Sequence, residues 1–371
     1  MFLKKLTVTN FKNYTDTDLE FSEKINCFVG DNGEGKTNLM DAIYYLSFCK
    51  SYFNPIDSQN IRHDEDFFAI HGYYQKEEDK VDMISCIQKR NQRKLFKINK
   101  KEYDKLADHI GLYPLVMVSP YDRDLISDGS ELRRKYIDGL ISQFDRIYLD
   151  DLINYNKALE QRNILLKRFA DKIPYDESSL ELWNIHLCKH GANIHQKRKS
   201  FLEDFLPLFQ EYFAYISGGK EKVFIEYISQ LNNNNLADLF ASNLKRDRML
   251  QYTTCGIHKD DLDLKISGFP IKKFGSQGQQ KSFVVAMKLA QFEFTRNIKK
   301  VKPILLLDDI FDKLDNRRVE QLINLAGSDK FGQVFITDTQ HDRIAKIFKN
   351  ADIPHKIFTI NAGVATEITQ Q

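Results

Sequence analysis

The part of the chain that most constrains its fold is a glycine-rich run at residues 30–37 with the pattern G-x-x-x-x-G-K-[ST]. An apolar stretch, Ile25–Val29, is predicted to be the strand before it, and residues 38–46 are predicted to continue as a helix. Glycines let the backbone curl around phosphate oxygens, while successive N–H groups and the helix N-terminus face the negative charge. A glycine-rich surface turn beside an ordinary lysine is the alternative. The order of strand, loop and helix instead favours a phosphate cradle for ATP or GTP.

Each part of this run has an expected task. Lys36 is expected to reach the β and γ phosphates, and the hydroxyl of Thr37 is a hard oxygen ligand of the kind that Mg²⁺ accepts. The predicted cofactors are therefore ATP and Mg²⁺. The predicted nucleotide-binding residues of this region are Gly30, Asp31, Asn32, Gly33, Glu34, Gly35, Lys36, Thr37 and Asn38.

Length and composition limit what can surround this site. The chain has 371 residues, of which 42% are hydrophobic, and this is enough for a sizeable core and roughly two domains. Its five cysteines include no C-x-x-C pair, which favours neither a disulfide framework nor a zinc site and fits a reducing cytoplasm. The sequence contains no run of about eighteen apolar residues and no export signal. We therefore expect a cytoplasmic protein that does not associate with membranes.

The formal net charge of +2 is nearly balanced, so bulk electrostatics alone does not predict binding to DNA or to an acidic membrane. Three local clusters of lysine and arginine are nevertheless candidates for contact with phosphate backbones. For any one cluster, a solvated face is the commoner explanation. The clusters are Lys89, Arg90, Arg93, Lys94, Lys97, Lys100 and Lys101; Arg133, Arg134 and Lys135; and Lys197, Arg198 and Lys199.

A second apolar strand, predicted at residues 303–307, ends at two carboxylates, Asp308 and Asp309. In an open α/β sheet, ligands bind at this carboxyl edge, so the pair is predicted to be the Walker B acidic pair of the same site. Asp308 is expected to hold the metal, directly or through water. Asp309 is expected to orient or deprotonate the attacking water, which makes Asp309 and Lys36 the predicted catalytic residues. Two aspartates that cap the following helix are the alternative.

Between these two motifs, residues 275–279 precede a long predicted helix at 282–296. A serine and glycines at a helix start form a second anion-binding terminus, and one nucleotide cannot easily use both termini. In the ATP-binding-cassette class, the signature segment at this place faces the γ-phosphate bound by the other subunit. The residues that resemble this signature are Ser276, Gln277, Gly278 and Gln279, and Asp315 resembles the D-loop aspartate. The order of the motifs favours a cassette ATPase over other phosphate-loop folds.

The spacing of the motifs predicts a discontinuous head. Lys36 and Asp308 are 272 positions apart (308 − 36), more than a compact transporter cassette needs and far less than a long coiled-coil insertion creates. Apolar residues at helical spacing, such as Tyr148 and Tyr155, predict helices in between, and no heptad pattern persists there. The predicted parts are an N-terminal head segment at 1–118, a mainly helical inserted lobe at 119–251 and a C-terminal head segment at 252–371.

At this point the chain resembles the RecF family of bacterial recombination mediators, cassette ATPases related to SMC-type heads without their long coiled coil. The resemblance spans nearly the whole chain and implies an α/β fold, an SMC-like ATPase head with an inserted helical lobe. The similar segments are N-F-K-N-Y at 10–14, S-P-Y-D at 119–122, R-R-K-Y-I-D at 133–138, Q-R-N-I-L-L at 161–166 and T-T-C-G-I-H-K-D-D at 253–261.

The resemblance also adds Lys12, in the first of these segments, to the expected nucleotide-binding residues. The chain departs from the family patterns at several positions. Tyr121 replaces a glutamate and Ile257 a proline, while Lys12 and Lys259 keep the positive charge of an arginine but lose its bidentate fork. Many cassette proteins place a γ-phosphate-sensing histidine after the strand predicted at 333–336. This chain has Thr337, Asp338 and Thr339 there and His341 later, so the sensor is not assigned.

What the resemblance implies is an ATP-dependent DNA clamp in recombinational repair and replication restart. ATP joins two heads into a homodimer, the dimer holds gapped DNA or junctions between single and double strands, and hydrolysis releases it. Turnover is expected to be slow and stimulated by DNA. The partners implied by the family are RecO and RecR, with which it helps to load the recombinase RecA.

Two other functions stay open at the level of sequence. A small-molecule kinase uses the same phosphate loop, although the signature-like segment and the distant Walker B strand argue against it. A cassette ATPase that acts as a scaffold in phage defence or damage signalling, without clamping DNA, is the second. In that case the basic clusters bind a protein or are only solvated.

Overall fold

The structure is a computed structural model that describes residues 1–77, 80–170, 177–219, 221–310, 321, 325, 327–340 and 353–368. The chain divides into two compact units, Met1–Asp122 with Gln291–Gln371, and Arg123–Ala290. Residues 252–290, which were expected in the head, thus fall in the second unit. The reason is that strand β10 (Asp261–Ile266) pairs along its whole length with β9 (Val223–Ile228) of the expected lobe.

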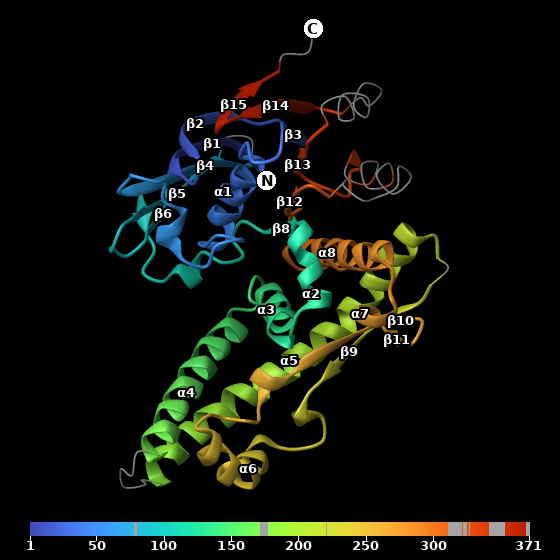
Figure 1. The fold of residues 1–371 in the computed structure, drawn as a ribbon. Helices are drawn as coiled ribbons and strands as arrows, with labels where there is room; N and C mark the ends of the chain where they lie inside the picture. The colour runs from blue at the N-terminus through green and yellow to red at the C-terminus, as the bar shows by residue number, and fades with distance from the viewer. Residues whose placement is uncertain are drawn as a thin grey trace. The chain divides into compact units, whose positions relative to one another are not determined.

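A six-stranded sheet of the first unit carries both nucleotide motifs (Figure 1). Its order is β15-β14-β3-β13-β12-β8, and all neighbours are parallel except β14 and β15. The strands are β3 (Ile25–Val29), β8 (Leu115–Val118), β12 (Ile304–Leu307), β13 (Val334–Asp338), β14 (His355–Asn361) and β15 (Val364–Glu367). Strands β3, β12 and β13 are buried throughout, which suits parallel strands covered on both faces. Because β13 lies between β3 and β12, the carboxyl ends of all three meet at one edge.

The second sheet of this unit is antiparallel, in the order β2-β1-β4-β5-β6-β7. Its strands are β1 (Phe2–Phe11), β2 (Tyr14–Glu20), β4 (Phe67–Glu77), β5 (Lys80–Lys89), β6 (Leu95–Ile98) and β7 (Lys101–Glu102). Helix α1 (Lys36–Phe48) contacts strands of both sheets. Its buried residues Leu39, Ile43 and Leu46 belong to one core with apolar residues of both sheets, so the helix that starts at the phosphate loop is firmly anchored.

Helices dominate the second unit, as predicted for the inserted lobe. They are α2 (Asp124–Ser127), α3 (Ser130–Ile141), α4 (Arg146–Ala170), α5 (Glu177–Ser217), α6 (Leu236–Leu250), α7 (Ile271–Phe274) and the start of α8 (Gln277–Lys299). The long helices α4 and α5 pack on each other through the apolar positions expected from helical spacing, among them Tyr148, Tyr155, Leu187 and Ile194. The segment D-K-I-P at 171–174, whose proline indicates a break between two helices, lies outside the described residues.

A small antiparallel sheet completes the second unit, in the order β11-β10-β9, with β11 at Phe269–Pro270. Gly218 and Gly219, which both have positive φ, lie between α5 and β9. Along α8, the apolar residues Phe283, Met287, Ala290 and Phe294 recur at helical spacing and are buried, as expected of core packing. Among the described helices, none combines the length and the apolar content that a membrane span requires.

Candidate nucleotide-binding site

The phosphate loop joins β3 to α1 with three glycines in conformations that other residues avoid. Gly30, Gly33 and Gly35 have φ of 157°, 90° and 114°. A Cβ on Gly30 would clash with the carbonyl of Ile360, and one on Gly35 would clash with the side chain of Asn13. Gly30 and Gly35 are therefore required by close approach as well as by backbone conformation, and Gly33 by its backbone conformation alone.

Neighbouring segments hold this loop in shape. The amide of Asn13 donates to the carbonyl of Glu34 at 2.9 Å, and the hydroxyl of Tyr14 donates to the carbonyl of Gly35 at 3.1 Å. From the β14–β15 turn, Gly363 N also donates to the carbonyl of Glu34, and Ala362 N donates to its carboxylate. Glu34 thus supports the loop rather than facing the pocket.

Lys36 is the cation of the site, and its ammonium lies over the loop itself. Its Nζ donates to the carbonyl oxygens of Gly30 at 2.7 Å and Asp31 at 2.8 Å. An ammonium group has three donors, and these two partners are neutral, so phosphate oxygens can bind here as the charged partner. Burial lowers the pKa of Lys36, while nearby carboxylates, led by Asp309 and Asp308, oppose that shift.

The two halves of the predicted site meet at the sheet edge. The hydroxyl of Thr37 donates to Asp308 Oδ1 at 2.9 Å, across 271 positions of sequence. Thr337 Oγ1 donates to the same oxygen at 2.9 Å and accepts from the backbone N–H of Asp309 at 2.7 Å. Thr337 lies near the end of β13, and its hydroxyl thus connects the carboxylate of Asp308 to the backbone of Asp309. The sequence drew attention to position 337 only through the absent histidine.

The two aspartates lie in different environments. Asp308 is buried, and this burial raises its pKa to about 6, against hydrogen bonds from Thr37 and Thr337 that favour the carboxylate. Asp309 is half-buried and has a φ of 46°, a left-handed conformation that is uncommon for any residue but glycine. Such backbone conformations cluster at functional sites, where the surroundings fix the direction of a side chain.

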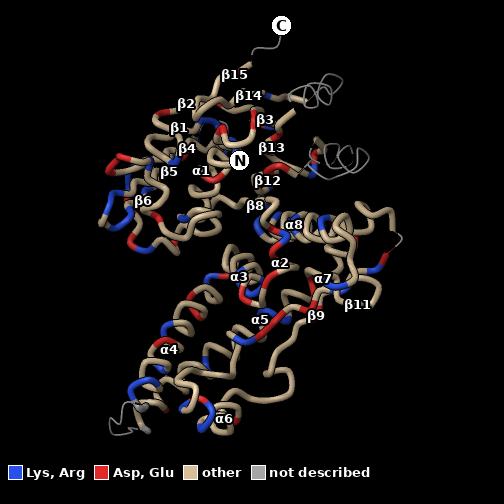
Figure 2. Tube along the Cα trace, viewed as in Figure 1, with Lys and Arg blue, Asp and Glu red and all other residues tan. Residues whose placement is uncertain are grey.

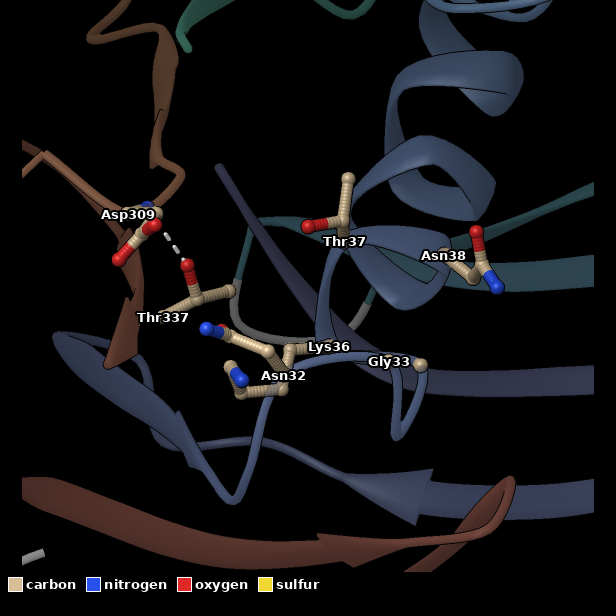
Figure 3. A pocket seen from close by; sticks show the side chains of 8 residues that line it. Asn32, Gly33, Lys36, Thr37, Asn38, Asp309 and Thr337 are labelled. Carbon is tan, nitrogen blue, oxygen red and sulfur yellow. Dashed lines mark hydrogen bonds between the residues drawn. The ribbon is translucent and has the colours of Figure 1, made fainter. Parts of the chain in front are cut away.

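A pocket of about 160 Å³ lies between the loop and the Walker B strand. Figure 3 shows Asp309 and Thr337 on one side of it, Lys36 and Asn32 from the loop, and Thr37 at the start of α1. The predicted residues that line the pocket are Asn32, Gly33, Gly35, Lys36, Thr37, Asn38 and Asp309; Thr337 is the further one. Asp308 lies behind them, bonded to Thr37 and Thr337.

Lys12 does not line this pocket. Its Nζ forms an ion pair with the buried carboxylate of Asp41 at 2.6 Å, and Asp41 also accepts from Ser51 Oγ and Tyr52 N. Asp41 lies in the second turn of α1, and no sequence motif marked this position as functional. The structure therefore gives Lys12 a partner other than the nucleotide.

The donor set at the edge fits Mg²⁺. A threonine hydroxyl and a carboxylate are hard oxygen ligands, and Mg²⁺ is usually held by one or two such groups together with phosphate oxygens and water. Among the described residues, no group of three or more His, Cys, Asp or Glu could hold a metal by itself. The chemistry of Thr37 and Asp308 thus suits a metal that arrives with its nucleotide.

The signature-like segment lies in the second unit, at the start of α8. Ser276 Oγ accepts from Gln279 N at 3.2 Å, and Ser276 N donates to the side chain of Gln279 at 2.6 Å, which is a reciprocal capping box. Ser276 and Gln277 are exposed, and Gly278 is half-buried. Asp315, which the sequence predicts to be the D-loop aspartate, and the later His341 lie outside the described residues.

In two of the three basic clusters, an arginine forms ion pairs inside the second unit. Arg133 forms a two-pronged pair with Asp261, at 2.7 and 3.1 Å. The buried Arg198 pairs with both Asp138 and Asp260 at 2.9 Å. These arginines cannot face solvent phosphates.

The remaining cluster, around β6, is the most exposed. Lys94 is an exception, since its Nζ lies 2.6 Å from Asp57. Figure 2 shows lysine and arginine segments beside β6, with acidic segments close to them. The exposed members, none of which pairs with a carboxylate in the described part of the chain, are Lys89, Arg90, Arg93, Lys100 and Lys101.

The segments that carried the family resemblance in the second unit form the same internal network. Arg162 is fully buried and contacts Asp247 at 2.7 Å. His258 lies between Tyr155 and the carbonyl of Thr253, and burial lowers its pKa to about 4, so it is neutral at pH 7. These motif residues hold the unit together.

A phosphate loop, an acidic pair at the same edge of a parallel sheet and a helical unit that starts a signature-like helix define an ATPase head of the ATP-binding-cassette class. Comparisons with known proteins agree. The family model described as RecF/RecN/SMC N terminal domain matches residues 2–366. The chain belongs to the RecF family.

Relatives and solved structures support this assignment over the full length. The chain is 50% identical over 368 residues to the DNA replication and repair protein RecF of Phocaeicola vulgatus, covering 99% of this chain and 98% of the relative. It is 51% identical over 360 residues to the protein of the same name from Flavobacterium johnsoniae, covering 97% and 100%. The solved recombination mediator protein RecF-ATP of the RecFOR pathway has a TM-score of 0.89 at 30% identity, covering 99% and 98%. An Smc head bound to a ScpA domain, at 17% identity and a TM-score of 0.59 over 100% and 98%, shares the fold.

Proposed function

We propose that this chain is an ATPase that closes as an ATP-dependent homodimer on gapped DNA or on junctions between single and double strands, and that hydrolysis releases it. The observation that carries the proposal is the bond from Thr37 to Asp308, because it joins the phosphate loop to an acidic pair at one sheet edge. A fixed loop, a cation with neutral partners and a directed carboxylate are what phosphoryl transfer to water requires.

In this proposal, each residue of the site acts on a stated group. Lys36 neutralises charge on the β and γ phosphates. Asp309 accepts a hydrogen bond from the attacking water and aims it at the γ phosphorus, whose bond to the ADP oxygen breaks. Thr337 fixes the backbone of Asp309 and, with Thr37, orients Asp308 Oδ1. Mg²⁺ held by Thr37 and Asp308 supplies charge neutralisation on the phosphate oxygens.

Dimer formation is proposed to depend on the second anion-binding terminus. Ser276 and the first turn of α8 are exposed, and in the cassette arrangement they face the γ-phosphate held by the other copy. ATP can then drive closure because it makes contacts in the dimer that it does not make in the monomer. Hydrolysis removes the γ-phosphate from this interface, and the dimer opens.

DNA and the partner proteins are the least direct part of the proposal. The named relatives are DNA replication and repair proteins, and the solved relative is named as a mediator of the RecFOR pathway. We therefore extend to this chain the family partners RecO and RecR and the loading of RecA. DNA contact is expected to be with the backbone, since no residue pattern announces the reading of base edges.

Fluorescence anisotropy with a labelled gapped duplex tests the DNA part. We expect a non-hydrolysable ATP analogue to tighten binding about tenfold or more over ADP, and we expect the affinity to fall as salt is raised. The control is Ser276→Arg, which should still bind the analogue but lose the tightening. If the analogue-bound protein binds neither gapped, duplex nor single-stranded DNA at low salt, the DNA clamp is rejected.

One observation favours a second candidate, a cassette ATPase scaffold that does not clamp DNA. Part of the basic character that suggested DNA contact is internal, because Arg133 and Arg198 pair with aspartates inside the second unit. If the ATP-bound dimer forms and no DNA binds at low salt, the scaffold replaces the clamp.

A further inference from the structure

Two exposed phenylalanines lie just before the signature-like segment. Phe269 in β11 is 57% exposed and Phe274 at the end of α7 is 64% exposed, and their ring centroids are 5.3 Å apart. A single exposed apolar side chain is ordinary. Two aromatic rings that contact each other in solvent form a patch, and aromatic residues are enriched in the centres of protein interfaces.

Anchored backbone presents these rings. Phe269 follows the tight β10–β11 turn and pairs with Ile266. The side chain of Ile271, fully buried, fixes α7, and its carbonyl accepts from Gly275 N at 2.9 Å. The backbone that carries the rings is therefore ordered before any partner binds, which lowers the entropic cost of binding.

The charges beside the rings indicate which surface they fit. Lys272 and Lys273 are exposed on the same short helix, and neither pairs with a carboxylate within the described ranges. The surroundings of the phosphate loop are complementary: Asp31 is exposed there, and Val364 is 62% exposed. Val364 lies next to the loop because Gly363 N donates to the carbonyl of Glu34 at 3.0 Å.

We propose that Phe269 and Phe274, with Lys272 and Lys273, form a docking surface for the region around the phosphate loop of a second copy of this chain. The inference rests on the proposed ATP-dependent dimer and deepens it. Phe274 is two residues from Ser276, so a partner that brings its nucleotide to this helix start also covers the rings. ATP then supplies the trigger, and the aromatic surface supplies much of the affinity.

The test is the dimer dissociation constant, measured by sedimentation velocity with a non-hydrolysable ATP analogue. The double variant Phe269→Ala/Phe274→Ala is expected to weaken the dimer on the order of 100-fold, as truncation of two interface anchors does. Affinity of the monomer for a fluorescent ATP analogue should stay unchanged. The matched control is Ile147→Ala/Met249→Ala, which removes apolar groups that are 69% and 81% exposed in the same unit and should leave the dimer intact.

A second variant keeps the test decisive if the alanine variant folds poorly. Lys272→Glu/Lys273→Glu changes only exposed side chains and is expected to weaken the dimer about tenfold at low salt, with the effect shrinking as salt screens the charges. If the wild type dimerises and both variants dimerise equally well, the docking surface is wrong and the proposed function stands. If the wild type stays monomeric with ATP analogue, the proposed dimer fails and this inference fails with it.

Discussion

The nucleotide site and the buried charge network of the second unit use the same kinds of side chain in opposite ways. In the site, the hydrogen-bond partners of Lys36 among the described residues are the backbone carbonyls of Gly30 and Asp31, and Asp308 is buried beside two threonine hydroxyls. In the second unit, Arg198 is buried against the carboxylates of Asp138 and Asp260. The charge of Lys36 in the first region can pair with a ligand, whereas the charge of Arg198 in the second is paired with carboxylates of the same chain.

This difference predicts opposite responses to mutation. A buried charge whose partner is a missing ligand destabilises the free protein, so its removal should increase stability and abolish function. A buried charge with a partner in the chain leaves that partner unpaired when it is removed.

The largest effect is expected at Asp309. Asp309→Asn keeps the shape of the side chain but removes the carboxylate that orients water, so turnover should fall about 10² to 10⁴-fold. ATP binding should be unchanged, and ATP-bound dimers should live longer. Single-turnover hydrolysis with a parallel binding assay measures this. Unchanged turnover would remove Asp309 from the chemistry.

In the second unit, Arg198→Met should lower the free energy of unfolding by about 3 to 5 kcal/mol, because Asp138 and Asp260 lose their cation. Urea denaturation measures this loss. Its neighbour provides the control: Lys197 makes an exposed pair with Asp145, and Lys197→Met should cost less than about 1 kcal/mol. If both variants lose the same free energy of unfolding, burial of the Arg198 ion pairs makes no difference to stability.

Asp308 should respond with the opposite sign. Its pKa is about 6 in the folded state against 3.8 ordinarily, so the folded carboxyl holds its proton more tightly. This contribution favours folding at low pH and is lost as pH rises from about 4 to about 6. At pH 7, Asp308→Asn should therefore raise the free energy of unfolding of the nucleotide-free protein by about 1 to 3 kcal/mol.

Asp308→Asn should also abolish Mg²⁺-dependent turnover. Its gain in the free energy of unfolding should vanish when unfolding is measured below pH 4. Denaturation curves at pH 4 and pH 7 measure the sign. If Asp308→Asn instead lowers the free energy of unfolding at pH 7, the charge of Asp308 is compensated inside the chain, as that of Arg198 is. The proposed difference between the two regions would then be wrong.

The smallest effect is expected at Thr337. Thr337→Val keeps the shape and removes the hydroxyl that connects both aspartates, and loss of such a supporting hydrogen bond costs about 10 to 100-fold in metal affinity or activity. Mn²⁺ binding followed by electron paramagnetic resonance, in the presence of nucleotide, provides a readout other than turnover. Thr337→Ser should restore it. If Thr337→Val binds Mn²⁺ with normal affinity, the hydroxyl of Thr337 does not support the metal site.

Much of the nucleotide site was predictable because its chemistry is local in sequence. Phosphate binding needs glycines, a lysine and a hydroxyl at fixed spacing, and an apolar strand ending in two aspartates has one common use in such a sheet. Thr337 was not assigned, since a threonine at a strand end is common and its role depends on strand order. The pairing of β13 between β3 and β12 makes the position meaningful.

The fold of the second unit was predictable in kind, as a helical lobe, but which of its charged side chains are buried was not. Arg133 and Arg198 lie in basic runs that suggest a nucleic-acid surface, yet their partners are far away in sequence and unreadable from the runs. Lys12 is similar, because its ion pair with Asp41 depends on how α1 packs. Net charge of a segment does not tell which of its members are buried.

The central claim is that the ATP site of one copy is completed by the signature-like segment of another. Its most direct test is the mass in solution of the wild type and of Ser276→Arg, each without nucleotide, with ADP and with a non-hydrolysable ATP analogue. The account predicts a dimer only for the wild type with the analogue, while both proteins bind the analogue as monomers. A Ser276→Arg variant that dimerises as the wild type does, or a wild type that stays monomeric throughout, would contradict it.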